Sequence, residues 1–217
     1  MGPPPELTEA LVLRTADSDD NKVVHLLTPD LGHVPAFARK ARVSKRHTGG
    51  HLDLLHRVEV RLSGRRDRDL ARLDSARTLE VFGGIRADLL RFAQASCMVD
   101  VVLHLVPEHG HEPGVYELLL RALRHLDRAS TTPPVDVLLL FELRMLEGSG
   151  VLPGVDALEG LSQRAREVLT AWHAGQWLPL PDDERAAVGR ALEGLIEQAS
   201  GGVLKSRRFL DAMLSEG

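Results

Sequence analysis

The chain has 217 residues, 43% of them hydrophobic, and a formal net charge of -4, so it is long and apolar enough for one large or two modest globular domains. No apolar run reaches the roughly 20 residues that a membrane-spanning helix needs, and the start MGPPPELTE lacks the features of a signal peptide, so we expect a cytoplasmic protein outside the membrane. A single cysteine, Cys97, excludes an internal disulfide, and its apolar helical surroundings indicate a buried structural thiol.

Five short segments before Phe82 carry the Val- and Leu-rich, alternating pattern that is typical of β-strands. Turn-forming sequences separate them, and they cover residues 9–15, 22–28, 33–39, 54–63 and 69–81. Five strands in about eighty residues predict a small closed or nearly closed barrel, with the five-stranded oligonucleotide-binding (OB) barrel as the template.

A basic stretch free of acidic residues runs from Leu31 to Leu52, through the third predicted strand and the segment that follows it. It carries Arg39, Lys40, Arg42, Lys45 and Arg46. Such a segregated patch predicts a polyanion ligand, nucleic acid first, because each cation that meets a phosphate releases a condensed counterion. The alternative is a solvated loop whose charges only maintain solubility.

Other cations extend this candidate surface. Arg14 and Arg61 lie in the first and fourth predicted strands, and Lys205, Arg207 and Arg208 form a second basic cluster near the chain end. The alternative for that cluster is the solvated end of a helix. Before Phe82 the barrel offers a single aromatic residue, Phe37, for base stacking, so we expect contacts mainly to phosphates, with strong salt dependence and little base preference.

The hydrophobic period becomes helical after Gly83-Gly84, and the charge balance changes there too. Up to Phe82, Lys and Arg number 14 against 12 Asp and Glu; beyond it they number 13 against 19. We therefore predict an OB domain over residues 1–82 and an all-α domain over 83–217. Its helices are expected at residues 85–106, 113–128, 134–150, 162–175, 181–200 and 203–214, the third of them buried nearly all round.

Several of these segments together resemble the RecO family of DNA repair proteins, over nearly the whole chain. They are ARKARVSKRHTGGHL after the third strand, the helix RADLLRFAQASCMVDVVLHLVPE and the ending LKSRRFL. The loop keeps the family's Ala38, Ala41, Arg42, Lys45, Gly49 and Gly50 and conserves the charge at Arg39. It departs at Lys40, where the family tends to glycine, and at Thr48, where it tends to phenylalanine.

The resemblance implies a recombination mediator: an OB barrel and a helical domain that bind single- and double-stranded DNA in the bacterial cytoplasm, on the nucleoid during repair. Such proteins anneal complementary strands and work with RecR, and in some members with RecF, to place RecA on DNA coated by single-strand-binding protein. Many members hold zinc in a four-cysteine ribbon inserted in the helical domain. Here only GSGVLPGVDALEGL stands at that place and no C-x-x-C pair exists, so we expect no zinc and no other cofactor.

The residues favour no enzyme. Phosphate-cradling G-x-x-x-x-G-K-[ST], G-x-S-x-G and H-E-x-x-H motifs are all absent from the sequence. The histidine pairs 47 and 51, and 109 and 111, lack a convincing third ligand and are interpreted as surface or loop histidines. The alternative to a DNA-binding mediator is a non-enzymatic adaptor whose helical domain binds protein partners, with the barrel as a docking or RNA-binding module.

One stripe of cations on the predicted helix 113–128 suggests a partner site. Arg121, Arg124 and Arg128 stand at spacings of three and four, beside an inward face of Val115, Leu119, Ala122 and Leu126. An apolar groove bordered by guanidinium groups suits an acidic peptide with an apolar end, and the resemblance suggests the C-terminal tail of single-strand-binding protein. The alternative is a solvated outer face.

Overall fold

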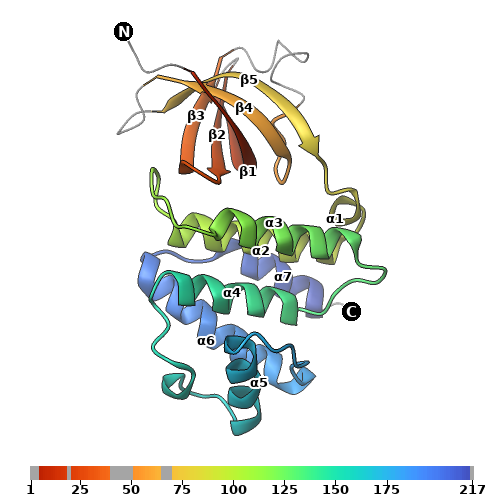
Figure 1. Cartoon of the computed structure of the whole chain (residues 1–217). Helices are drawn as coiled ribbons and strands as arrows, with labels where there is room; N and C mark the ends of the chain where they lie inside the picture. Colours follow the sequence, from red (N-terminus) through yellow and green to blue (C-terminus); the bar gives the residue numbers. More distant parts are fainter. Residues whose placement is uncertain (1–4, 19–20, 40–50, 65–69, 216–217) are drawn as a thin grey trace. The chain divides into compact units, whose positions relative to one another are not determined.

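The computed structural model describes residues 5–18, 21–39, 51–64 and 70–215. Its first part contains a closed barrel of five strands in the order β1-β2-β3-β5-β4 (Figure 1). The strands are β1 (Glu6–Ser18), β2 (Asn21–Thr28), β3 (Gly32–Ala38), β4 (Arg57–Ser63) and β5 (Ala71–Glu80). The prediction of a small five-stranded barrel of the OB type is therefore confirmed, with β1 starting earlier and β4 later than the sequence pattern indicated.

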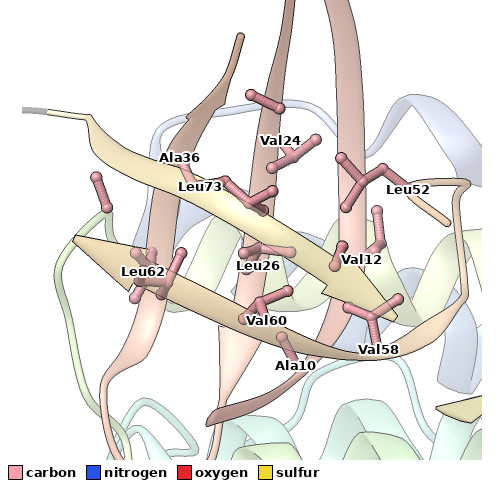
Figure 2. Packing of buried hydrophobic residues seen from close by; sticks show 14 residues of the cluster. Ala10, Val12, Val24, Leu26, Ala36, Leu52, Val58, Val60, Leu62 and Leu73 are labelled. Atoms are coloured by element: carbon pink, nitrogen blue, oxygen red, sulfur yellow. The ribbon is translucent and has the colours of Figure 1, made fainter. Parts of the chain in front are cut away.

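Aliphatic side chains at alternate strand positions fill the barrel, because successive side chains of a strand point to opposite faces. In Figure 2, Val12, Val24, Leu26, Val60 and Leu62 meet in the interior, and each is fully buried. The register changes once on β1, between Val12, which pairs with Leu26, and Arg14, which pairs with His25. This irregularity adds one residue to β1 at Leu13 and sets the pairing of the strand beyond it.

The chain divides into two compact units, one of residues Met1–Gly83 with Val106–Leu120 and the other of Gly84–Leu105 with Arg121–Gly217. The segment 106–120 thus belongs with the barrel. The backbone N–H of His33 donates to the Gly110 carbonyl (2.9 Å), and that of His109 donates to the His33 carbonyl (2.8 Å). Gly32 permits this approach, because a Cβ there would lie 2.0 Å from the Gly110 oxygen. The limits of the two domains stay a prediction.

The second part of the chain is all-α, as predicted. Its elements are α1 (Gly83–Ala87), α2 (Leu89–Leu105), α3 (Val115–Arg128), α4 (Asp136–Gly148), the short 3-10 helix η2 (Val155–Ala157), α5 (Gln163–His173), α6 (Asp182–Ser200) and α7 (Lys205–Ser215). The predicted starts of the helices 162–175 and 181–200 agree with the structure: the Ser162 side chain accepts from Ala165 N–H, and Pro181 stands directly before α6.

The predicted helix 85–106 is instead two helices, separated at Asp88. The Asp88 carboxylate accepts the backbone N–H groups of Leu90 (2.9 Å) and Arg91 (3.1 Å), so it caps a new helix start. The apolar spacing of this segment, Ile85, Leu89 and Phe92, would place Leu89 on an inward face, but its exposed fraction is 58%. Because α2 packs against α4, α6 and α7, its burial extends around most of its circumference.

Helix α4 is buried nearly all round, as predicted, although two of its buried side chains are acidic. Asp136 accepts from Arg185 Nε (2.6 Å) and from Leu180 N–H (2.9 Å), and Glu142 pairs with Arg207. Buried carboxylates need such partners, since an unpaired buried charge is very costly. None of the helices that the structure describes is long and apolar enough to cross a membrane.

Candidate nucleic-acid interface

The basic stretch leaves the barrel at the end of β3. Register places Ala38 opposite Lys22 at the start of β2, and Phe37 opposite Arg72 at the start of β5. Arg39 follows directly and is exposed. The predicted contacts Lys40, Arg42, Lys45 and Arg46 lie outside the described residues. Because their segment departs at Arg39, the end of the barrel where these three strands meet is the candidate interface.

The charges at this end are partly compensated. Arg72 Nε lies 3.0 Å from Asp74 Oδ1, and Lys22 stands opposite Asp17 in the β1–β2 register. Arg39 has no ion pair with any described residue. Sequence reasoning missed Lys22 and Arg72 because each is a single cation in a strand, and only strand register brings them beside the basic stretch. Phe37, the one aromatic candidate, is half-buried, which limits base stacking.

Arg61 lies on β4, between Leu7 of β1 and Ser75 of β5. It is exposed and lines a shallow groove of about 450 Å³. Arg77 also lines this groove and donates to Glu59 Oε1 (3.1 Å), so the charge of that second arginine is locally compensated. Arg61 stands two residues before Ser63, which pairs with Arg72 of β5, and Arg72 in turn stands opposite Phe37 of β3. The register therefore places Arg61 on the strand next to those that form the end of the barrel at Arg39.

Arg14 is exposed on β1, where its Nη2 lies 2.9 Å from His25 Nε2. His25 in turn lies beside His33 of β3, with 3.1 Å between His25 Nδ1 and His33 Nε2. Burial lowers the pKa of both imidazoles below the ordinary value, and the Arg14 charge lowers that of His25 further. The sequence showed two histidines within apolar strands, but nothing in it paired them with Arg14.

The second basic cluster is divided by the structure. Lys205 and Arg208 are exposed on α7, whereas Arg207 has an exposed fraction of 6% and pairs with Glu142 inside the helical unit. Burial raises the pKa of the Glu142 carboxyl, and the Arg207 charge opposes that rise. The prediction that Arg207 contacts DNA therefore needs correction: its guanidinium is committed to a buried carboxylate.

The α3 stripe is present, with Arg121 and Arg128 exposed and Arg124 half-buried. Leu119 and Leu126 beside it are fully buried. They face inward as expected, so at these two positions the apolar side of the proposed groove is core rather than open surface. Docking of an acidic tail here stays a prediction. Leu119 and Leu126 are not available to the apolar end of such a tail, so less apolar surface lies beside the arginines than the sequence indicated.

The region that stands in place of the zinc ribbon is organised by an arginine. Arg166 on α5 donates to the backbone carbonyls of Val155 (2.8 Å), Asp156 (2.8 Å) and Leu158 (2.5 Å), around η2. The residues do not fit a four-cysteine site, because the sequence has one cysteine and it is buried in α2. Among the residues that the structure describes, no group of three or more His, Cys, Asp or Glu side chains could hold a metal ion.

Comparison with known proteins assigns both parts of the chain to one family. Residues 5–82 match the family model for the N-terminal part of recombination protein O, and residues 86–158 match that for its C-terminal part. The chain is 34% identical over 124 residues to DNA repair protein RecO of Dehalococcoides mccartyi strain CBDB1, covering 57% of this chain and 48% of the relative.

Two further relatives carry the same name. The RecO protein of Anaeromyxobacter dehalogenans strain 2CP-C is 37% identical over 124 residues, covering 57% of this chain and 49% of that protein. The RecO protein of Syntrophotalea carbinolica is 33% identical over 121 residues, covering 55% and 47%. The matches thus span about half the length of these curated relatives. With two family models matched in order along a closed OB-type barrel and the helices that follow it, the chain belongs to the RecO family.

Proposed function

We propose that this protein is a DNA-binding recombination mediator whose barrel contacts the phosphate backbone of single- and double-stranded DNA. The observation that carries the proposal is the position of the acid-free basic stretch, which leaves an OB-type barrel at Arg39, where β2, β3 and β5 meet. A cation cluster on such a barrel suits a polyanionic strand, because phosphate contacts supply affinity without reading sequence.

The finer part of the proposal follows from family membership. We expect the protein to anneal complementary strands and to help RecR, with or without RecF, place RecA on DNA that single-strand-binding protein covers. It would do so as a non-enzymatic factor in the cytoplasm, where bacterial DNA lies. The names of the relatives support a role in DNA repair. A strand-annealing assay with labelled complementary oligonucleotides, with and without single-strand-binding protein and RecR, tests this part.

Charge reversal tests DNA binding directly. Changing Arg39, Arg42, Lys45 and Arg46 to Glu should weaken binding to every DNA sequence alike, measured by fluorescence anisotropy with labelled oligonucleotides at two salt concentrations. The slope of log affinity against log salt should become shallower by about 0.7 for each phosphate of a single strand that the variant no longer neutralises. RNA of the same sequence, measured in parallel, tests the alternative of an RNA-binding module.

A matched pair of double variants separates a local contact from net charge. Arg39→Glu with Arg42→Glu alters the basic stretch, whereas Arg164→Glu with Arg190→Glu changes the charge equally at two exposed positions on α5 and α6. Both pairs lower the net charge by the same amount, which weakens DNA binding through long-range repulsion. Only the first pair should lose DNA affinity beyond that shared repulsion. Wild-type affinity in the folded fourfold variant would contradict the proposed function.

A further inference from the structure

A chain of hydrogen bonds runs across the outer side of the barrel from Arg14 to the backbone of Val106. Arg14 Nη2 lies 2.9 Å from His25 Nε2, His25 Nδ1 lies 3.1 Å from His33 Nε2, and His33 Nδ1 lies 3.0 Å from the Val106 carbonyl oxygen. All four groups belong to the barrel unit. His25 and His33 have exposed fractions of 6% and 2%, so water does not substitute for these contacts.

The two ends of this chain determine where every proton lies. A carbonyl oxygen only accepts, so His33 must carry its proton on Nδ1 and leave Nε2 as an acceptor. His25 must then donate from Nδ1, which leaves its Nε2 free to accept from Arg14, a group that only donates. The geometry therefore requires two neutral histidines, both protonated at Nδ1. Their lowered pKa values are consistent with this state at neutral pH.

The partner of Arg14 is unusual among the arginines of this protein. Several other arginines pair with carboxylates, which compensate their charge locally: Arg57 with Glu9, Arg72 with Asp74, Arg77 with Glu59, Arg91 with Asp88, Arg144 with Glu147, Arg185 with Asp136 and Arg207 with Glu142. A neutral imidazole orients the Arg14 guanidinium through one nitrogen without compensating its charge. Among the residues that the structure describes, no carboxylate pairs with Arg14, and an exposed guanidinium held in this way suits an anion.

The groups around the histidines support this orientation. Glu108 Oε1 lies 3.7 Å from His25 Nδ1, whereas Arg14 contacts the other ring nitrogen, Nε2. His109 contributes to the lowering of the His33 pKa. The segment that carries both residues is joined to β3 by the two backbone hydrogen bonds at His33. The groups that face the imidazole pair are thus Arg14 from β1 and Glu108 and His109 from the segment after α2.

We propose that His25 and His33 are positioning residues that hold the Arg14 guanidinium as a phosphate contact on the outer side of β1. This inference rests on the proposed DNA-binding function and extends its surface from the end of β3 to β1. Neither histidine touches the ligand. Each acts through Arg14 by limiting the directions in which its remaining N–H groups point, which reduces the conformational entropy cost of binding a phosphate.

A double-mutant cycle tests the coupling. Fluorescence anisotropy with a labelled oligothymidylate at pH 7.5 would compare the wild type, Arg14→Ala, His25→Phe and the double variant. Arg14→Ala should raise Kd about tenfold and make the salt slope shallower by about 0.7, as expected when one phosphate of a single strand is no longer neutralised. His25→Phe keeps the ring but removes both nitrogens, and it should raise Kd roughly threefold in the wild type and hardly at all in Arg14→Ala. His125→Phe, at an exposed α3 position, is the matched control and should change neither background.

Nuclear magnetic resonance of the wild-type chain supplies a readout that does not depend on any variant folding. Proton–nitrogen correlation spectra of the imidazoles at pH 7.5 should show His25 and His33 protonated at Nδ1, whereas free histidine favours Nε2. DNA should shift the Arg14 side-chain signals together with His25 Nε2. Protonation of His25 at Nε2 would overturn the inference, as would equal effects of His25→Phe in both backgrounds.

The outcomes also separate this inference from the function on which it rests. If Arg14→Ala binds DNA like the wild type while the fourfold Glu variant of the basic stretch does not, the inference fails and the proposed function stands. If the wild-type protein does not bind DNA, both fail.

Discussion

Removal of the Arg207 guanidinium should destabilise the helical unit rather than weaken DNA binding. Arg207 pairs with Glu142, which is fully buried on α4. Arg207→Ala leaves that carboxylate without its cation, and Glu193, whose Oε2 lies 3.9 Å from Arg207 Nε, is deprived of a nearby positive charge. The neighbouring Arg208→Ala is the matched control, since Arg208 is exposed on the same helix.

The magnitude follows from the burial of both partners. Breaking a buried ion pair by removing one side typically costs about 3–5 kcal/mol, because the remaining charge is uncompensated. An exposed substitution such as Arg208→Ala usually lies within about 0.5 kcal/mol of the wild type. The double variant Glu142→Leu with Arg207→Met should recover most of the stability, since apolar residues of similar volume often replace a buried pair at little cost.

Urea unfolding followed by circular dichroism measures these free energies, and anisotropy with labelled DNA measures affinity under conditions where all variants are folded. We expect Arg207→Ala to unfold at clearly lower urea than Arg208→Ala and to keep its DNA affinity. If Arg207→Ala were as stable as the wild type and bound DNA weakly, the buried pair would not be the role of Arg207, and Arg207 would be a DNA contact after all.

Three further predictions concern stability and metal. Burial lowers the pKa of His25 and His33 in the folded chain, so only the unfolded chain takes up protons near the ordinary value of 6.5. As the pH is lowered past about 6.5, the free energy of unfolding should therefore decrease, by up to roughly 1.4 kcal/mol per pH unit for each histidine. In urea titrations of His33→Phe, the free energy of unfolding should depend less on pH. Arg166→Ala should cost about 1–3 kcal/mol, since it removes hydrogen bonds from a charged donor to three carbonyls, whereas the exposed Arg164→Ala should cost little in the same assay. Elemental analysis should find no stoichiometric zinc, and a chelator should leave Tm unchanged. The lone thiol, Cys97, is buried, and burial raises its pKa to about 12, so the thiolate that would bind zinc is disfavoured. One tightly held zinc per chain would contradict this prediction.

The elements of the fold could largely be predicted from the sequence, because their signals are local. Alternating aliphatic residues identified the strands, and Ser162 and Pro181 identified the starts of α5 and α6. The break at Asp88 was missed because the apolar spacing continues through it, and only the capping hydrogen bonds reveal a new helix. Local pattern therefore predicts which elements form better than it predicts where one helix becomes two.

The burial of Arg207 had a signal in the sequence, but on another helix. Asp136 and Glu142 stand in the predicted helix 134–150, which is apolar nearly all round, although the prediction did not address these two carboxylates. A buried carboxylate requires a cation or donors, and a search for its partner would have pointed to an arginine elsewhere in the helical part. Composition alone could not choose Arg207 over Arg208, because the two are adjacent and only the packing of α7 on α2 fixes which one points inward.

The Arg14 site had no comparable signal, and its formation explains why. Arg14 meets His25 because the pairing of β1 with β2 shifts by one residue at Leu13. His25 meets His33 across β2 and β3, and His33 meets the Val106 carbonyl, which follows it by 73 positions in the sequence. Each of these steps is set by register or by docking of a distant segment, and neither leaves a periodic trace in the sequence. A charge run such as residues 39–46 can be seen in one dimension, whereas a single arginine oriented by neutral neighbours can be found only in three.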